Sequence, residues 1–578
     1  MVRLADVAPL VRQILDKRGI VGDEAQLAFL NPSYDDTNYD PLLLPGMQLA
    51  VERLLEARQR GEQVTVYCDY DVDGTTSAAL LLDALSRFGI TANYYVPDRF
   101  AEGYGLNKAA IKQLKEAGTD LILTVDNGIV SFDEVTYAAE LGVDIIVTDH
   151  HTPRDTVPAA VAVVDPKILL RDYPDSYDEH LILIPDSTGD RGDKLYPFVD
   201  LCGCGVAFKL VQALQQALPD DLPLGQEKWL LDLVALATVS DIVGLVDENR
   251  AIVRWGLEVI KKTRRPGVKA LAAVAGIELK DIDSRAIGFV LGPRLNAAGR
   301  LANARLAVEL LSTTDNARAL ELATELDQLN SQRKKLQAEI YEQAVRQVKS
   351  TDPVVIAVGD DWHEGVIGIA ASKVEEKMER PTFVCSCHDD VIKGSGRSFG
   401  DFSIAAVINA TSSLLERGGG HAAAGGITVA RDKFAAWCQA VQDYYASLKL
   451  RPAEQLKYLY PPADVTLSQL DGLTPELVRS LGLLEPFGAA NSVPVFLLAD
   501  IVVAERRLMG ADLQHVRYTF MDNNGNKLQA VAFNAADRFT IEPGEFGELV
   551  RANALVELTL NEWNGNVTVQ GKLLKLDN

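Results

Sequence analysis

Short apolar runs alternate with amphipathic stretches from residue 46 to about residue 165. The runs have the length and the β-branched or aromatic composition of buried strands, and they cover residues 64–68, 92–96, 120–125, 144–148 and 161–164. Helical patterns lie between them, for example over residues 76–88 and 132–141. This alternation predicts a doubly wound α/β domain with a parallel sheet, which we extend to residues 46–302.

The middle of the chain continues with helices and then a second α/β segment. Residues 171–198 are rich in Asp and interrupted by Pro and Gly, which predicts a surface insertion. Helical patterns follow over residues 206–218 and 228–238, and a helical connector is expected over residues 303–350. A mixed α/β domain is expected over residues 351–450, where the pattern restarts with DPVVIAVG.

The ends of the chain differ from the middle. Residues 1–45 combine helical pieces with a turn-rich loop, and we treat them as an N-terminal segment. Residues 455–578 contain strand pairs around Asn-Gly turns, in RYTFMDNNGNKLQAVAF and ALVELTLNEWNGNVTVQGKLLKL. These pairs predict a small β-barrel of the OB type.

Composition limits the class of protein. The 578 residues suggest several domains, and 47% hydrophobic with 24% charged residues is typical of soluble globular proteins. The first residues lack the apolar core of a signal peptide, and the apolar runs are too short to span a bilayer, so we expect a cytoplasmic protein with no membrane partner. Six cysteines in so long a chain do not make a disulfide framework, and their spacing does not favour a zinc site.

The formal net charge of −24 is unfavourable for a nucleic-acid enzyme, because phosphate contacts favour Lys and Arg. A global sum does not describe one groove, however. A cluster of catalytic carboxylates also adds negative charge, which bound metal ions would offset. The acidic balance still argues against a protein that coats duplex DNA indiscriminately.

The strongest chemical signal is the segment VTVYCDYDVDG, where a strand pattern ends in Asp69, Asp71 and Asp73. In extended backbone alternate residues face the same side, so Asp71 and Asp73 are expected to point into one site. Like charges gathered together need cations to compensate. A calcium loop of the EF-hand type is the alternative, but it needs a glutamate at its twelfth position, which here is Leu80.

Three further motifs place polar side chains after apolar runs. Asp126 follows LILTV, the triplet Asp149, His150 and His151 follows DIIVT, and Asp241 ends LLDLVALATVS. Asp126 alone is weak evidence, because a helix-capping Asp is as common. Ligands of open α/β sheets gather beyond the carboxyl ends of the strands. Carboxylates with imidazole suit Mn²⁺ or Mg²⁺, and two such ions can stabilise the attacking and leaving oxygens of phosphoryl transfer.

These motifs carry a family resemblance. In order and spacing, VYCDYDVDG, TVDNG, VTDHH and ATVSDIVGL resemble the motifs of the DHH phosphoesterases. Downstream, GFVLGPRLNAAGRL, WHEGVIGIAASKV, IKGSGRS, GGGHAAAGG and LEPFGAANSVPVF resemble the RecJ family of single-strand-specific exonucleases. The resemblance covers about residues 46–565. It implies a DHH domain, a DHHA1 domain over residues 351–450, and 5′ to 3′ release of mononucleotides from single-stranded DNA.

The resemblance also implies a ligand set for two Mn²⁺ or Mg²⁺ ions. Asp126 would bridge the ions and Asp71 would bind one of them. The second ion would be bound by Asp73, His150 and Asp241.

Other residues would act around these ligands. The resemblance implies that Asp69 and Asp149 orient the ligands and that His151 contacts the scissile phosphate. Arg397 and His421 of the second domain would close over the site.

Nucleic-acid contacts are expected in both large domains and in the barrel. KGSGRS is expected to form a glycine-rich loop in which Arg397, with Ser395, suits bidentate phosphate contact. Gly420 with His421 in GGGHAAAGG lets backbone approach a ligand, although that run is also compatible with a tightly packed helix start. Arg294, Asn296 and Arg300 either line the DNA path or brace the site. In the barrel, the basic and aromatic candidates are Arg506, Arg517 and Tyr518, of which Tyr518 or its neighbour Phe520 is expected to be buried.

One position departs from related DHH pyrophosphatases, which have a histidine where this chain has Tyr67. A phenol is a poor metal ligand at neutral pH, so one metal site is expected to be weaker or completed by water. Two other functions stay open: a DHH phosphodiesterase acting on oligoribonucleotides or cyclic dinucleotides, and a non-catalytic replication scaffold. The resemblance further implies recombination and repair, with a single-strand-binding protein and a helicase as partners, and we expect a monomer.

Overall fold

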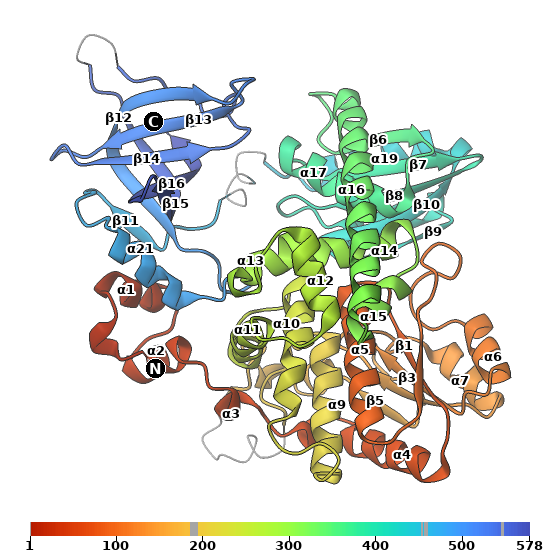
Figure 1. Ribbon diagram of the computed structural model, residues 1–578. Helices are drawn as coiled ribbons and strands as arrows, with labels where there is room; N and C mark the ends of the chain where they lie inside the picture. Colours follow the sequence, from red (N-terminus) through yellow and green to blue (C-terminus); the bar gives the residue numbers. More distant parts are fainter. Residues whose placement is uncertain (1, 185–194, 452–454, 456–459, 545–547, 578) are drawn as a thin grey trace. The chain divides into compact units, whose positions relative to one another are not determined.

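The computed structural model describes residues 2–184, 195–451, 455, 460–544 and 548–577. It divides the chain into two compact units (Figure 1). The larger unit contains residues 33–449 and 488–491. The smaller unit contains residues 1–32, 450–487 and 492–578.

The larger unit begins with a five-stranded parallel sheet in the order β2-β1-β3-β4-β5. Its strands are β1 (Val64–Cys68), β2 (Ala92–Tyr95), β3 (Leu121–Val125), β4 (Asp144–Thr148) and β5 (Ala162–Val164). The sequence pattern therefore predicted all five strands of a doubly wound sheet, within one residue at each end. Cys68 pairs with Val125, and Val125 pairs with Thr148, so the carboxyl ends of three strands meet at one edge.

Side chains at alternate positions of the strands are buried on opposite faces of this sheet. Val66, Leu123 and Ile146 pack against helices on one face, whereas Tyr67 and Ile122 pack against helices on the other. The helices of the first face are α4 (Met47–Arg60), α5 (Val72–Arg87) and α9 (Gly203–Ala217), and those of the second are α6 (Lys108–Glu116) and α7 (Phe132–Glu140). Because both faces are covered, the central strands β1 and β3 are buried along their whole length, as parallel strands usually are.

A helical region follows the sheet. It contains α10 (Leu231–Ser240), α11 (Asp247–Ile260), α12 (Pro266–Ala275), α13 (Ser284–Ala286), α14 (Gly292–Leu301) and α15 (Arg305–Ser312), with the short α3 (Tyr34–Thr37) and α8 (Lys167–Asp172) earlier in the chain. The 32-residue helix α16 (Asn316–Gln347) then spans about 48 Å. Leu322 and Leu326 of α16 lie in the core of the parallel-sheet region, whereas Ile340 and Ala344 lie in that of the following α/β region. The expected connector is thus mainly this one helix.

The second α/β region has a mixed sheet in the order β6-β7-β8-β10-β9. Its strands are β6 (Val355–Asp360), β7 (Thr382–His388), β8 (Val391–Arg397), β9 (Arg417–Gly420) and β10 (Ala424–Ala430), and its helices are α17 (Glu364–Met378), α18 (Ile404–Ala410) and α19 (Phe434–Ser447). The β6–β7 pair is parallel, and the other pairs are antiparallel.

The smaller unit is a barrel with helices. Its strands are β11 (Val465–Leu467), β12 (Val495–Met509), β13 (His515–Met521), β14 (Lys527–Ala532), β15 (Arg551–Trp563) and β16 (Asn566–Asp577). Because β12 pairs with both β13 and β15, five of these strands close into the predicted OB-like barrel. Helices α1 (Pro9–Lys17), α2 (Asp23–Leu30) and α21 (Pro475–Leu481) complete the unit.

Two features differ from the sequence analysis. Residues 1–45 do not form one segment, because Val11 and Ile14 of α1 join the barrel core while residues from Ser33 onward belong to the larger unit. The segment 171–198 is not a plain surface insertion either. Tyr196 and Phe198 are fully buried in the core of the larger unit. Residues 185–194 of this segment lie outside the described residues.

Candidate metal and phosphodiester site

The carboxyl ends of β1, β3 and β4 place their following residues at one edge of the parallel sheet. Asp69 follows β1, Asp126 follows β3, and Asp149 with His150 follows β4. The aligned register described above brings these residues together although up to 81 positions separate them in the sequence. This edge is where the strand-end rule predicted a ligand site.

Helix α5 begins inside the acidic motif. Asp71 is its N-cap, and its carboxylate accepts a hydrogen bond from the Gly74 backbone N–H at 3.1 Å. Asp73 lies in the first turn of the helix, so the expected extended backbone from Asp71 to Asp73 is wrong. The Asp73 carboxylate instead accepts bonds from the backbone N–H groups of Gly203 (2.6 Å) and Cys204 (2.8 Å) at the start of α9.

Asp126 occupies a tightly enclosed position. Its backbone has a φ of 62°, a left-handed conformation that Asp and Asn tolerate better than most residues. A Cβ atom added at Gly203 would lie 2.7 Å from the Asp126 Cβ and 3.0 Å from Asp73 Oδ2. Only glycine therefore fits where α9 passes these two carboxylates.

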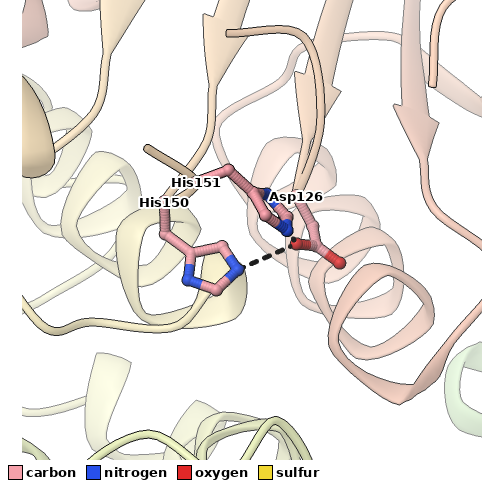
Figure 2. A group of neighbouring side chains, drawn as sticks. All are labelled: Asp126, His150 and His151. Carbon is pink, nitrogen blue, oxygen red and sulfur yellow. Dashed lines mark hydrogen bonds and ion pairs between the residues drawn. The ribbon is translucent and has the colours of Figure 1, made fainter. Parts of the chain in front are cut away.

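His150 is the centre of the carboxylate cluster. Its Nε2 lies 3.1 Å from Asp126 Oδ1, 3.8 Å from Asp73 Oδ2 and 3.7 Å from Asp241 Oδ2. Figure 2 shows the rings of His150 and His151 directed toward the Asp126 carboxylate from the same strand end. His150 and Asp126 are both buried, so little water reaches this contact.

His151 is held from two sides. Its Nδ1 lies 2.7 Å from Asp149 Oδ1, and Asp149 also accepts backbone bonds from His150 and Ile129. The Tyr104 hydroxyl lies 3.3 Å from the same Nδ1 and donates to the Asp126 carbonyl at 3.0 Å. The His151 side chain is 41% exposed, so one part of the ring stays open toward the cavity.

Asp241 approaches the cluster from another element. It caps the carboxyl end of α10, a helix that the sequence pattern predicted over residues 228–238. Its side chain is 21% exposed, more than those of Asp73 or Asp126.

Burial and mutual repulsion determine the protonation of the carboxylates. Burial, reinforced by Asp73 and Asp71, raises the pKa of Asp126 well above its usual value. Burial and the charge of Asp71 raise the pKa of Asp73 to about 7, and burial with the charge of Asp73 raises the pKa of Asp241 to about 9. Carboxylates in such proximity resist ionising together unless a cation is near.

The surroundings shift the pKa values of the two histidines in opposite directions. Burial lowers the pKa of His150 to about 3, so its ring is neutral and available as a ligand at physiological pH. Burial also disfavours the charged form of His151, but the hydrogen bond and charge of Asp149 outweigh it and raise the pKa of His151. Burial alone would raise the pKa of Asp149, whereas His151 holds it below its usual value.

The donor set fits divalent metal ions. Three groups each bring their ligating atoms within 4.8 Å of one another: Asp73 with His150 and Asp241, Asp69 with Asp71 and Asp126, and Asp126 with His150 and His151. In addition, Asp69 Oδ1 is buried without a hydrogen-bond partner among the described residues. An oxygen-rich set with one or two imidazoles is the chemistry that Mn²⁺ and Mg²⁺ accept.

A cavity of about 370 Å³ opens beside this cluster. Asn296 and Arg300 of α14 line it together with Asp71, Asp126 and other polar residues. Asn296 accepts a hydrogen bond from the Val72 N–H at 3.1 Å, so it braces the start of α5. Burial, with the charge of nearby Arg99, lowers the pKa of Arg300 to about 10.

A second cavity, of about 530 Å³, adjoins the first through Arg99 and Arg300, which line both. Ser395 and Arg397 also line it. KGSGRS is part of strand β8, however, and not the loop that its glycines suggested. The Arg397 guanidinium donates to Ser372 Oγ, Ser395 Oγ and the Gly396 carbonyl, which fixes its plane.

Three expected nucleic-acid residues of the larger unit line neither cavity. Arg294 donates to Asp327 of α16 at 2.9 Å, an ion pair within the fold. Gly420 ends β9, and His421 begins the turn between β9 and β10, so GGGHAAAGG is a hairpin and not a helix start. His421 is exposed, and its backbone carbonyl accepts from the Ala405 N–H.

The barrel candidates are engaged within their own unit. Tyr518 is fully buried and donates to the Phe539 and Ile541 carbonyls, so its ring is not available for stacking on a base. Phe520 is buried as well, although the sequence predicted one buried ring of the two. Arg506 donates to the Phe539 carbonyl and pairs with Glu542, whereas Arg517 is partly exposed.

Sequence reasoning missed several residues of these cavities. Arg99 and Tyr104 follow β2, so the strand-end rule applied to VPDRFAEGYG would have found them. Lys393 and Arg417 line the second cavity from β8 and β9. Lys393 begins the motif KGSGRS and Arg417 directly precedes GGGHAAAGG, but neither was singled out. Among the described residues of the barrel unit, the rings of Phe533 (66%) and Trp563 (73%) are exposed, and neither was singled out.

Tyr67 takes no part in the site. Its ring stacks on Tyr95 with centroids 5.1 Å apart, and its hydroxyl donates to the Gly105 carbonyl at 3.0 Å. The strand alternation described above turns it to the face of α6 and α7, away from α5.

Three family models match the chain. Residues 63–238 match the DHH family, N-terminal domain, residues 351–447 match the DHHA1 domain, and residues 463–575 match the RecJ OB domain. Among the described residues, no helix combines the length and apolar composition needed to cross a membrane.

The relatives that match more than nine-tenths of this chain carry one name. The single-stranded-DNA-specific exonuclease RecJ of Bacillus subtilis is 36% identical over 96% of this chain, which spans 66% of that relative. RecJ of Escherichia coli is 33% identical over 98% of this chain and 95% of its own length. The crystal structure of RecJ in complex with Mn²⁺ from Thermus thermophilus matches 99% of this chain and 78% of that one, with a TM-score of 0.77 and 28% identity.

Proposed function

Because the chain belongs to the RecJ family, we propose that it is a metal-dependent exonuclease that hydrolyses single-stranded DNA from its 5′ end and releases 5′-mononucleotides. The observation that carries the proposal is the His150–Asp126 contact at 3.1 Å, where two groups of carboxylates meet at one sheet edge. The buried imidazole is neutral, and the pKa values of the carboxylates around it are raised. These carboxylates can all be ionised in a stable site only when divalent cations offset their negative charge.

We assign two ions to the cluster. Asp126 would bridge them, Asp71 would bind one, and Asp73, His150 and Asp241 would bind the other. Mn²⁺ or Mg²⁺ would supply charge stabilisation for the attacking and leaving oxygens of the phosphodiester. The Mn²⁺ in the relative's structure supports this choice of metal.

The surrounding residues would position the ligands and the substrate. Asp149 would orient the His150 and His151 backbones, since it accepts a hydrogen bond from the N–H of each and a third from Ile129, and Asp69 would stand close to the first ion. His151, which Asp149 favours in its charged form, would contact the scissile phosphate from the open side of its ring.

The second cavity would hold the strand. Arg300 with Ser395 and Arg397 would bind phosphates there, since the fixed guanidinium planes suit bidentate contact. His421 and Gly420, from the β9–β10 turn, would close over the strand. A channel that admits one strand would exclude duplex.

We propose the domain roles on the same basis. A DHH catalytic domain (46–302) would be followed by the connector (303–350), the DHHA1 domain (351–450) and a nucleic-acid-binding OB domain (455–578). The protein would act as a cytoplasmic monomer in recombination and repair, with a single-strand-binding protein and a helicase as partners.

The first experiment is digestion, with Mn²⁺, of a single strand labelled at the 5′ or the 3′ end. We expect immediate release of the 5′ label as mononucleotide from single-stranded DNA, and none from matched duplex or single-stranded RNA. Asp126→Asn should abolish release, because the amide keeps the size and tolerates the left-handed backbone but removes the charge. Asp133→Asn, at an exposed acid of α7, is the matched control.

Release of the 3′ label first would overturn the polarity but leave the site intact. An Asp126→Asn protein as active as the wild type would overturn the site itself.

A further inference from the structure

The motif LEPFGAANSVPVF, residues 484–496, has no part in the cavities or in the carboxylate cluster. Most of it belongs to the smaller unit, but residues 488–491 belong to the larger unit. The chain therefore leaves the smaller unit after Phe487 and returns to it at Ser492. These four residues, the 488–491 turn, are thus connected covalently on both sides to the unit that contains the barrel.

The 488–491 turn is closed by its own backbone. The Gly488 N–H donates to the Asn491 carbonyl at 2.9 Å, and the Asn491 N–H donates to the Gly488 carbonyl at 3.2 Å. Between them Ala490 has a left-handed φ of 56° and is exposed, whereas Asn491 is only 2% exposed. The turn therefore has a defined shape with a buried residue at its base.

The turn packs on the loop that joins α10 to α11, within the larger unit. The N–H of the buried Leu245 in that loop donates to the Ala489 carbonyl at 2.9 Å. A Cβ atom added at Gly488 would lie 2.6 Å from Leu245 Cδ1, and one added at Gly244 would lie 3.5 Å from Ala490 Cβ. The two segments are therefore in close contact although they are far apart in the sequence.

Other contacts fix the same half of the loop. The Gly244 N–H donates to Asp200 Oδ2 at 2.9 Å. The Asn249 side-chain amide donates to the Gly244 carbonyl at 3.0 Å and to the Asp200 carbonyl at 2.6 Å. Together with the bond from Leu245 to Ala489, these contacts hold residues 244–245 from three other segments of the chain.

The metal ligand Asp241 lies in the other half of the loop. Its N–H donates to the Ala237 carbonyl of α10 at 2.8 Å, and its Oδ2 lies 3.7 Å from His150 Nε2. The next residue, Ile242, has a left-handed φ of 63° and is 74% exposed, so it adds little packing. The position of Asp241 therefore depends on α10 before it and on the anchored residues 244–245 after it.

We propose that the 488–491 turn is a positioning element for Asp241, an inference that rests on the proposed binding of two ions. By holding Leu245, the turn sets how closely the Asp241 carboxylate approaches the second ion, which Asp73 and His150 would also bind. Groups that orient a metal ligand without touching the metal change metal affinity by about 10- to 100-fold when they are lost. Because the turn belongs to the connection that leads to β12, the metal site depends on that connection as well as on the parallel sheet.

Ala490→Val tests the proposal, because a β-branched side chain disfavours left-handed backbone and strains the turn at an exposed position. In a calorimetric titration of the full-length protein with Mn²⁺, we expect one ion to bind about 10-fold more weakly and the other to bind as before. Below saturating Mn²⁺, kcat should fall while KM for single-stranded DNA stays constant, and excess Mn²⁺ should restore kcat. Gly488→Val, whose side chain would push against Leu245, should act in the same way.

Two further variants are the controls. Ala490→Gly should bind Mn²⁺ as the wild type does, because glycine adopts left-handed backbone without strain. Asp389→Val introduces the same kind of strain at an exposed residue with a φ of 50°, between β7 and β8, and should also leave Mn²⁺ binding unchanged. Circular dichroism should show that all four variants fold.

A double-mutant cycle separates positioning from a general effect on the fold. In an Asp241→Asn background, Ala490→Val should weaken Mn²⁺ binding no further, because the ligand that the turn positions is already lost. The proposal is overturned if Ala490→Val and Gly488→Val bind both ions as tightly as the wild type. It is also overturned if Ala490→Val reduces the affinity equally with and without Asp241. A wild-type protein that binds no Mn²⁺ would instead overturn the proposed metal site, and this inference with it.

Discussion

Tyr104 has a hydroxyl that links two parts of the candidate site. It donates to the Asp126 carbonyl and lies 3.3 Å from His151 Nδ1. We expect Tyr104→Phe to lower kcat for single-stranded DNA by about five-fold, the effect of losing one hydrogen bond worth about 1 kcal/mol. KM should stay constant, because the ring that lines the cavity is kept.

Steady-state kinetics over a range of pH would check this effect. If Tyr104 positions His151, the pH profile of kcat shifts in the variant while Mn²⁺ affinity does not. Tyr137→Phe, on α7 away from the cavities, is the control. An unchanged kcat in Tyr104→Phe would show that Asp149 alone holds the His151 ring.

Gly203 gives a second prediction at the residue scale. An alanine methyl there would lie 2.7 Å from the Asp126 Cβ, which is closer than real carbon contacts allow. We expect Gly203→Ala to displace the two carboxylates and to reduce cleavage by about 100-fold, as ångström-scale misplacement at reaction centres does.

Calorimetric titration of Mn²⁺ should show weakened binding in Gly203→Ala, with circular dichroism unchanged. Gly288→Ala serves as the control, since its methyl would find the Val239 side chain at a comfortable 3.7 Å. Normal metal binding by Gly203→Ala would mean that α9 can move away from the site at little cost.

At the scale of elements, Asp522 ties the β13–β14 hairpin to the rest of the barrel unit. Its carboxylate accepts from the N–H groups of Leu470, Asn524 and Asn526. Burial alone would raise the pKa of Asp522, but these backbone bonds and the Asn526 amide lower it to about 2. A lowered pKa in the folded state stabilises the fold above the ordinary carboxyl pKa of about 4, and this contribution is lost as the pH falls through about 2.

The melting temperature of Asp522→Asn should therefore lie below that of the wild type at pH 6. The difference should shrink steadily between pH 4 and pH 2, because protonation makes the two side chains alike. Asp512→Asn, at an exposed acid of the same unit, should show no such trend. A difference that is independent of pH would assign the effect to shape and not to charge.

The sequence predicted best those elements in which a single pattern of hydrophobic and polar positions repeats along the chain. The five strands of the parallel sheet are apolar runs between amphipathic helices, so their bounds agree closely. The N-terminal helices were not assigned to the barrel, because Val11 and Ile14 meet it through contacts more than 400 residues apart in the sequence. Likewise, KGSGRS lies in a strand because Gly394 and Gly396 leave room for the side chains of Cys385 and Phe383 on the neighbouring strand. Composition alone does not reveal this packing.

The candidate site was predictable where a strand end carried it. Asp69, Asp126, Asp149 and His150 follow strands, so one rule brought them together. Asp241 lies at a helix end, and it was included because an acid directly follows a long apolar run. Tyr518 was chosen for its chemistry, but burial of both Tyr518 and Phe520 removed it from the surface.

At the scale of the whole molecule, a net charge of −24 repels a DNA strand from most of the surface. Five basic residues nevertheless line the 530 Å³ cavity: Arg99, Arg300, Lys393, Arg397 and Arg417. If these contact phosphates, log KM should rise with log salt concentration at a slope of about 0.7 for each phosphate neutralised. Lys393 already pairs with Glu364 at 2.9 Å and should contribute less than the arginines.

Arg417→Ala tests this arrangement, since Arg417 is exposed on β9 and stands outside the metal cluster. We expect its salt slope to fall by about 0.7 while kcat at low salt and fixed Mn²⁺ stays near the wild-type value. Arg431→Ala, an exposed arginine that lines neither cavity, should keep the full slope. Equal salt slopes in the two variants would mean that the strand does not pass β9.

A salt slope of log KM near zero in the wild type would mean that the negative charge of the chain as a whole, and not this cavity, controls how DNA approaches the site.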